Sequence, residues 1–328
     1  MTNKNYHTLS GSDISEESKD IRYSEYRRQW HENPEKYVVN DFPLFLDIEA
    51  TSVCNLKCPH CIQTSSNFKK GFMPLSLYKN VIDEASENNC YGCKYHTIGR
   101  GEPLLHRQIV QMVEYAKKRG LIDVYLNTNA TLLNASIVKD LLDAGLDRIS
   151  LSIDGFRKDY YERNRVGANF DRLFNAVEGF KNYRDRFGYK TRIRIQTVKL
   201  EGLDLNEYSN FWGGYCDEVS YIDYKDMGRR KYNVIDKKFS CPQLWQRMSI
   251  LWNGSVLPCN HDDREFAKIG DMRGGDISIY KAWNSSAMKY MRELHKGGNS
   301  HFLAACDGCV LRSSEILRKG LSYAKRNK

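Results

Sequence analysis

Three cysteines stand close together in the first quarter of the chain, in a spacing that could bind a metal cluster. Cys54, Cys58 and Cys61 form a Cys-x-x-x-Cys-x-x-Cys loop directly after the strand-like run 44–49. Thiolates are soft ligands suited to iron-sulfur clusters, and three of them can hold three irons of a cubane and leave the fourth iron open. A site that binds a reactant needs such an open position. The alternative is a zinc site completed by His60 or by a distant ligand, although zinc sites usually use paired Cys-x-x-Cys units.

Four further cysteines lie in the C-terminal part: Cys241, Cys259, Cys306 and Cys309. The segment between the first two predicts a hairpin with an Asn-Gly turn at 253–254. Four thiolates complete a cubane with no open position. From these residues alone a structural zinc site is an equal alternative.

The remaining cysteines are Cys90, Cys93 and Cys216. The first two form a Cys-x-x-Cys pair, which could be a third metal site or a redox pair. All three precede predicted strands, so we expect them at the N-terminal end of a parallel sheet, opposite the cluster loop. A structural role is therefore expected, and Cys216 is a poor candidate for a hydrogen donor.

The elements that must position these residues alternate between strand-like and helical patterns. One clear helical face falls within residues 170–180, where apolar residues recur at helical spacing. Strands alternating with helices predict a parallel sheet with right-handed crossovers, in either an open doubly wound sheet or a partial barrel. The predicted strands are 44–49, 95–98, 123–126, 148–153, 192–198 and 218–224.

The chain divides by pattern into three parts. Residues 1–40 form an N-terminal extension, with Ile21, Tyr23, Tyr26 and Trp30 expected on one side of a helix that packs on the main domain. Residues 41–234 carry the α/β alternation, and 235–328 form a compact cysteine-containing domain and a basic tail.

Composition limits the class of protein. The chain has 328 residues, 41% of them hydrophobic, and a net charge of +9. This charge favours an anionic small-molecule substrate, but it is spread too evenly to indicate nucleic-acid binding. The N-terminus is polar and no run of about 18 apolar residues occurs, so we expect a cytoplasmic protein that binds no membrane. Cysteines in such a reducing compartment serve metals or catalysis more often than disulfides.

The cysteine loop and the segments that follow it resemble the radical S-adenosylmethionine (SAM) superfamily. In that family the open iron chelates SAM, and reduction of the cluster cleaves SAM to methionine and a 5′-deoxyadenosyl radical. The matching segments come in the expected order at the ends of successive strands. The residues that the resemblance marks as cofactor-binding are His60, Gly101, Glu102, Pro103, Asn127, Asn129, Ser152, Asp154, Arg165 and Gln196.

The resemblance also implies individual roles. Glu102, in a Gly-Glu-Pro segment, would meet the amino group of SAM, and Arg165 would pair with its carboxylate, with Arg163 as the alternative. Two positions depart from the family pattern. His60 stands where an aromatic residue is usual beside the adenine, and Arg100 stands where a second glycine is common.

The C-terminal cysteines resemble those of the twitch and SPASM domains that follow radical SAM barrels. The four present imply one auxiliary cluster, as in the twitch form. The resemblance therefore predicts an α/β fold with a partial (β/α)6 TIM-type barrel and a small twitch/SPASM-like domain. The implied cofactors are SAM and two 4Fe-4S clusters, one of which binds SAM.

The pattern is most similar to that of the 2-deoxy-scyllo-inosamine dehydrogenases, which oxidise a carbinol to a ketone. We expect a sugar, cyclitol or related small molecule, phosphorylated or not, as substrate and a reduced flavodoxin or ferredoxin-type protein as electron donor. Arg229 and Arg230 are candidates for binding the substrate or moving a proton. The alternatives are a peptide-modifying maturase, a radical epimerase and a non-enzymatic iron-sulfur scaffold.

Overall fold

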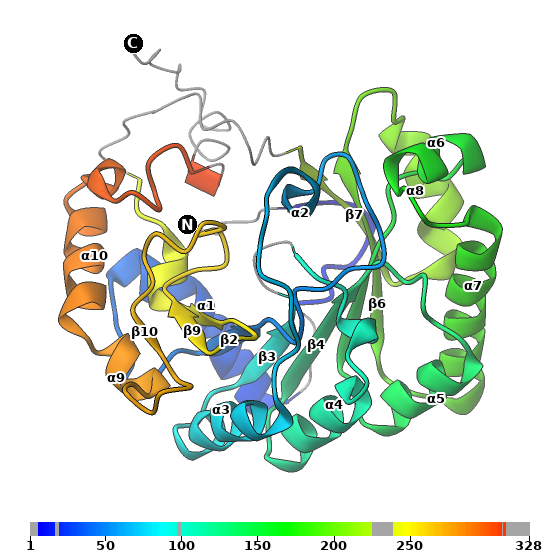
Figure 1. Ribbon diagram of the computed structural model, residues 1–328. Helices are drawn as coiled ribbons and strands as arrows, with labels where there is room; N and C mark the ends of the chain where they lie inside the picture. The colour runs from blue at the N-terminus through cyan, green and yellow to red at the C-terminus, as the bar shows by residue number, and fades with distance from the viewer. Residues whose placement is uncertain (1–5, 17–19, 97–99, 225–238, 310, 313–328) are drawn as a thin grey trace, which may run out of the picture.

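The structure, a computed structural model, describes residues 6–16, 20–96, 100–224, 239–309 and 311–312. In this part of the chain ten strands form one sheet, in the order β1-β7-β6-β5-β4-β3-β2-β8-β9-β10. The sheet curls into an open barrel with helices around its outer face (Figure 1). The cysteine-rich C-terminal segment, drawn in yellow to red, lies at one side.

Six parallel strands form most of the barrel wall, and they confirm the expected α/β partial barrel. α7 shows the predicted periodicity, since Leu173, Val177 and Phe180 are buried. The strands are β2 (Phe45–Ile48), β3 (Gly92–Tyr95), β4 (Asp123–Thr128), β5 (Arg148–Ser152), β6 (Arg192–Lys199) and β7 (Glu218–Asp223). The helices between them are α2 (Ile62–Ser65), α3 (Leu75–Glu87), α4 (Ile109–Lys118), α5 (Ala135–Asp143), α6 (Lys158–Asn164), α7 (Phe170–Phe187) and α8 (Leu205–Trp212).

β3 lies three residues earlier than the predicted strand 95–98, so that prediction was wrong. Glycine ordinarily weakens a strand interior. Here, however, a Cβ at Gly92 would lie 2.1 Å from the backbone oxygen of Asp123 on β4, so the two strands pair closely only because position 92 is glycine. The sequence does not reveal this close approach. As a consequence Cys93 lies within the strand instead of before it.

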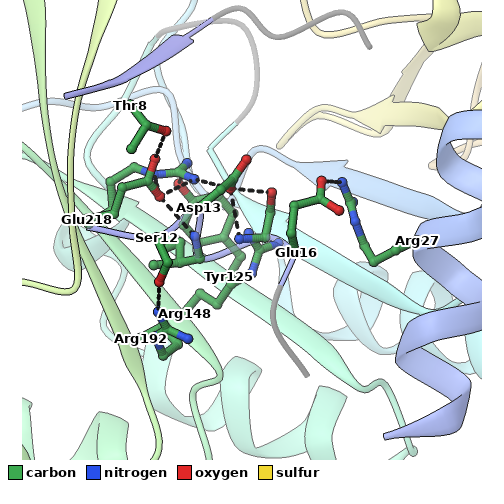
Figure 2. Close-up of polar contacts among 12 residues, drawn as sticks. Thr8, Ser12, Asp13, Glu16, Arg27, Tyr125, Arg148, Arg192 and Glu218 are labelled. Carbon is green, nitrogen blue, oxygen red and sulfur yellow. Dashed lines mark hydrogen bonds and ion pairs between the residues drawn. The ribbon is translucent and has the colours of Figure 1, made fainter. Parts of the chain in front are cut away.

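The N-terminal extension adds one strand to the sheet and contacts the inner wall of the barrel. β1 (Tyr6–Gly11) pairs antiparallel with β7. After β1, Asp13 lies 3.3 Å from Arg194 of β6. Glu16 accepts a hydrogen bond from Arg27 of α1 (Ile21–Lys36) (Figure 2). These contacts tie the extension to the charged inner wall.

α1 packs on the barrel through Tyr23 and Tyr26, as predicted. Ile21 does not belong to that face, because its side chain is 83% exposed. A helix turns about 100° per residue, so Ile21 lies roughly 200° around the axis from Tyr23. The predicted grouping of Ile21 with the packed face was wrong for this reason.

The C-terminal segment continues the same sheet. β8 (Arg247–Ile250) pairs parallel with β2, and β9 (Ser255–Leu257) and β10 (Gly270–Asp271) follow antiparallel. The hairpin predicted around 253–254 is therefore confirmed. α9 (Ile279–Trp283) and α10 (Ser286–Lys296) cover this part. The predicted domain boundary near residue 235 lies outside the described residues. None of the helices in the described ranges is long and apolar enough to cross a membrane.

Candidate functional site: two cysteine sets beside one cavity

The three-cysteine loop follows the C-terminal end of β2. Cys54, Cys58 and Cys61 all line one cavity of about 430 Å³. The Cys61 N–H donates to the Cys58 carbonyl oxygen at 3.1 Å, and the hydroxyls of Thr51 and Ser52 donate to carbonyls of residues 69–71. The structure thus brings the three predicted ligands together on a loop that is closed by its own hydrogen bonds.

These thiols lie in a partly buried environment. Burial raises the pKa of all three, and that of Cys58 to about 11, although the nearby Arg165 opposes the rise. A thiolate ligand must lose its proton when a metal binds. An iron cluster bound here would supply positive charge, which would stabilise the deprotonated form of these three cysteines.

The predicted Gly-Glu-Pro segment is hydrogen-bonded to the C-terminal end of β4. Glu102 is buried and accepts hydrogen bonds from the Thr128 hydroxyl at 2.6 Å and from the Asn129 N–H at 2.7 Å. Gly101 has a φ of +83°, and a Cβ there would lie 1.9 Å from a carbonyl oxygen of the cysteine-loop segment. Gly101 and Glu102 line the cavity, whereas Pro103 is buried in a 3-10 turn away from it.

Asp154 is completely buried between two nitrogen-bearing side chains. Its Oδ2 lies 3.1 Å from His60 Nε2 and 2.6 Å from Arg165 Nε. Burial alone would raise the pKa of this carboxyl, but Arg165 and His60 hold it well below its usual range. The other ring nitrogen, His60 Nδ1, is buried and has no hydrogen-bond partner within the described residues. A buried polar atom without a partner is costly, so a ligand would stabilise this position.

The other predicted cofactor residues come from neighbouring strand ends. Asn127 on β4, Ser152 on β5 and Gln196 on β6 line the same cavity as the cysteine loop, and so does Asn129. The alternative arginine, Arg163, instead stacks on Tyr160 at 5.4 Å and does not line the cavity. The structure therefore gathers every predicted cofactor residue except Pro103.

The wall of the cavity also holds polar residues that the sequence reasoning missed. The sequence did hold a signal for them, because polar residues recur at alternate positions of the buried strands. In β5, for example, Arg148 and Ser152 lie on the same face of the strand, and in a barrel this polar face points to the interior. The missed residues are Lys94, His96, Tyr125, Arg148, Arg194 and Arg247.

The four C-terminal cysteines line a second cavity. His295 of α10 contacts two of them: the Cys241 N–H donates to Nδ1 at 3.1 Å, and Cys306 Sγ lies 3.4 Å from Nε2. Burial and the neighbouring thiols raise the pKa of Cys259 and of Cys306 well above its ordinary value. The set, completed by Cys309, is a pure sulfur donor set. No three His, Cys, Asp or Glu side chains in the described ranges are spaced as they would be around a single metal ion.

The two cavities adjoin. Gln243, His261 and Leu311 line both of them. Gln243 also accepts a hydrogen bond from the Asn260 N–H at 3.1 Å, next to Cys259 in the chain. A wall of these side chains therefore separates the two cysteine sets.

The remaining predicted residues lie elsewhere. Cys90, Cys93 and Cys216 line neither of these two cavities, and burial raises the pKa of Cys90 and of Cys216 to about 12. These thiols are protonated at neutral pH, as a structural role requires. Arg229 and Arg230 lie outside the described residues.

Comparisons with known proteins decide the family. One family model, the radical SAM superfamily, matches residues 48–193, and another, the SPASM iron-sulfur cluster-binding domain, matches residues 241–310. The tungsten-containing aldehyde ferredoxin oxidoreductase cofactor-modifying protein of Pyrococcus furiosus is 34% identical over 322 residues, covering 82% of this chain and 88% of the relative. The chain belongs to the radical SAM superfamily.

Other relatives of this radical SAM chain match a smaller part of it. A GTP 3′,8-cyclase of Clostridium botulinum is 25% identical over 211 residues, which is 63% of the chain and 64% of the relative. The chain thus spans less than two thirds of that relative's length.

Solved structures share the fold. BtrN in complex with AdoMet and 2-DOIA has a TM-score of 0.58 at 18% identity, covering 83% of this chain and 94% of BtrN. The protein anSMEcpe with bound AdoMet gives a TM-score of 0.61 at 19% identity, covering 77% of this chain and 84% of anSMEcpe. Streptococcus suis SuiB bound to its precursor peptide SuiA gives 0.58 at 16%, covering 97% and 83%.

Each cysteine set lies within one of the two matched regions. A radical SAM domain binds SAM and a 4Fe-4S cluster, and a SPASM domain binds auxiliary iron-sulfur clusters. The residues present fit both groups. Three thiols, and His60 with its unpaired Nδ1, line one cavity, and four thiols line the other.

Proposed function

We propose that this radical SAM enzyme is a dehydrogenase that oxidises a carbinol carbon of a sugar, a cyclitol or a related small molecule to a ketone. The observation that supports it is the wall shared by the two cavities, formed by Gln243, His261 and Leu311. A substrate in the first cavity would lie beside an auxiliary cluster with four cysteine ligands. A cluster without an open position suits electron transfer better than substrate binding.

The proposed ligands are Cys54, Cys58 and Cys61 for one cluster, and the C-terminal four for the other. When bound, SAM and the first cluster supply a 5′-deoxyadenosyl radical after one-electron reduction by a flavodoxin or ferredoxin-type donor. Held by these cysteines, the two groups would supply a radical that removes a hydrogen atom from the substrate carbon and an acceptor for the remaining electron, while a basic group or water would take the hydroxyl proton. The substrate therefore loses two hydrogen atoms in all.

The chain's own residues would hold the reactants. Asp154 holds both His60 and Arg165, of which His60 would lie beside the adenine of SAM and Arg165 would pair with its carboxylate. Glu102 would keep two strand ends in place and face the amino group. Arg229 and Arg230 remain candidates for contacting the substrate or moving its proton.

Peptide modification and epimerisation are the competing reactions. Within the described residues the N-terminal extension forms one strand and one helix that pack on the barrel. Two curated relatives carry names that refer to small molecules, GTP and a cofactor, whereas SuiB was solved with a peptide. Epimerisation needs a hydrogen donor, and none of the cysteines outside the two sets lines the first cavity.

The deciding experiment is anaerobic reconstitution followed by incubation with sugar, cyclitol and peptide candidates. A product that lacks two hydrogen atoms, formed with one 5′-deoxyadenosine, is the expected result. A product of unchanged mass would instead show epimerisation, and a modified peptide would show the maturase reaction.

Two variants test the electron-acceptor role. Cys306→Ala should still form 5′-deoxyadenosine but no oxidised product, whereas the matched control Cys90→Ala, at a buried cysteine outside both sets, should behave as wild type. Circular dichroism must show that both are folded, because losing a cluster can unfold a domain. A folded Cys306→Ala protein that makes product at the normal rate would refute the role.

A further inference from the structure

Four cationic side chains on the inner wall of the barrel line the first cavity, whereas the carboxylates with which they form ion pairs do not line it. The four cations are Lys94, Arg148, Arg194 and Arg247. Those carboxylates are Asp47 for Lys94 and Arg247, Asp123 for Arg148, and Glu218 for Arg194. At this part of the wall a ligand therefore faces cations, whereas the carboxylates that line the cavity, Glu16, Glu102, Asp154 and Asp223, belong to other parts of the chain.

Two of the four cations are fully engaged. Arg148 forms a bidentate pair with Asp123, with both N···O distances at 2.7 Å. Arg194 donates to Glu218 at 2.9 Å and also contacts Asp13 and the Tyr125 hydroxyl. These two guanidinium groups have carboxylate partners of their own and hold the wall and the N-terminal extension together.

The other two cations share a single carboxylate. Lys94 Nζ and Arg247 NH1 each lie 3.2 Å from Asp47, which is completely buried. Burial alone would raise the pKa of Asp47, but the two cations hold it below its ordinary value, so the carboxyl is ionised. Two positive charges thus meet one negative charge in a buried place. An anion in the cavity would balance the second positive charge, since the side chains of Lys94 and Arg247 are only 16% and 17% exposed.

The hydrogen bonding of this group is also incomplete. Arg247 Nε is buried and has no hydrogen-bond partner within the described residues, and the same is true of Asp47 Oδ1 by hydrogen-bond geometry. Both ion-pair distances exceed the ~2.7–2.9 Å of strong charge-assisted bonds. Meanwhile the Arg247 guanidinium is held in place, 4.5 Å above the ring of Trp30. The group is thus fixed in position and has donor capacity left.

Its depth in the barrel suits one end of a substrate. Lys94 pairs in register with Asp47 on β2 and with Tyr125 on β4, inside the strands, whereas the cysteine loop follows the end of β2. A molecule bound at Lys94 would extend toward the mouth of the barrel, where the SAM-binding residues lie. Its anionic end would point away from the reacting carbon.

We propose that Lys94 and Arg247 bind an anionic group of the substrate, a phosphate or a carboxylate, at the deep end of the first cavity. The proposal rests on the proposed function in taking this cavity as the substrate site, and it narrows the substrate class to phosphorylated or carboxylated molecules. Both anions offer oxygen acceptors to an ammonium and a guanidinium group.

Isothermal titration calorimetry of the reconstituted, SAM-bound protein tests this with three probes: glycerol 3-phosphate, glycerate and glycerol. We expect one or both anions to bind and the neutral alcohol not to bind, and the better anion identifies the group. Lys94→Met and Arg247→Met should each weaken that binding by about tenfold to 100-fold, since each removes one charge-assisted hydrogen-bond donor. Asp47→Asn should tighten it, because the internal competitor is gone.

Lys117→Met is the matched control. Lys117 also pairs with a carboxylate, Asp147, but does not line the cavity, so this variant should bind the anion as wild type does. If Asp47→Asn fails to fold, the two methionine variants decide, since each leaves Asp47 with one cation. Failure of the wild-type protein to bind either anion, or equal binding by Lys94→Met, would overturn the proposal. SAM cleavage and product mass, measured separately on wild type, report on the proposed function, so the two can fail independently.

Discussion

Arg100 joins the barrel to the C-terminal segment through buried charge. Its Nε lies 2.5 Å from Glu49 Oε1, and its NH2 lies 2.9 Å from Glu265 Oε1. The Arg100 side chain is 3% exposed and that of Glu49 is completely buried, whereas that of Glu265 is 28% exposed. Glu49 also accepts a hydrogen bond from the Trp252 N–H.

Replacing Arg100 by methionine would leave the buried Glu49 carboxylate without its cation. Breaking a buried pair in this way costs about 3–5 kcal/mol of the free energy of unfolding. Glu265→Gln is the matched control, because removing a partly exposed partner costs about 1 kcal/mol or less. The double variant Arg100→Met/Glu49→Gln should recover most of the loss, since neither charge remains.

The loss should also depend on pH. Burial raises the pKa of Glu49 even with Arg100 present, and removing the arginine should raise it further. A carboxyl with a raised pKa binds its proton more tightly in the folded state, so the variant loses stability as pH rises above the unfolded value of about 4.3. The deficit relative to wild type is therefore larger at pH 8 than at pH 5.

Urea titration of anaerobically prepared proteins at both pH values measures these differences. A deficit below about 1 kcal/mol for Arg100→Met would mean that the pair contributes no more than an exposed one. A deficit that is equal at both pH values, or a double variant as unstable as Arg100→Met, would refute the burial argument.

Three further predictions concern the cofactor sites. Anaerobic reconstitution should give about eight irons per chain, and changing Cys54, Cys58 and Cys61 together to alanine should leave about half of the iron and no SAM cleavage; full iron retention or stoichiometric zinc would contradict this. Gly101→Ala should weaken SAM binding in equilibrium dialysis, because the new Cβ meets a backbone oxygen at 1.9 Å in a segment that lines the cavity; wild-type affinity would show that the backbone can shift freely. Arg292→Lys should lower iron retention by the auxiliary site, since lysine cannot reproduce the two bonds that Arg292 donates, one to the carbonyl oxygen of Leu244, three residues after Cys241, and one to that of Trp283; unchanged iron would show that the charge alone suffices.

The chemistry of the cofactors could be predicted from the sequence. The cysteine spacing within one short loop fixes which thiols can meet, whatever the rest of the fold does. The alternation of strands and helices then places the later motifs at one end of a parallel sheet, because all its strands run the same way. For this reason Glu102, Asp154 and Gln196 were expected near the cysteine loop, and the structure confirms that they share its cavity.

Local patterns failed where a backbone contact between distant segments decided the outcome. β3 begins at Gly92 because β4 approaches so closely at this position that only glycine, which has no side chain, can pair with it. The N-terminal extension contributes β1 to the edge of the sheet, and β8 joins β2, although neither pairing has a signal in its own segment.

What the sequence by itself determined is therefore the set of groups that can do chemistry: two cysteine sets and an ordered series of SAM-binding motifs. What only the tertiary structure decided is which charged side chains line the first cavity and which carboxylates pair with them. Charged side chains are scattered through the sequence, and strand register alone determines which carboxylate stands behind which cation. Lys94 and Arg247 lie far apart in the chain and share Asp47 only because β3 and β8 flank β2. Electrostatic balance is a property of distances in space, and the linear order of residues does not contain it.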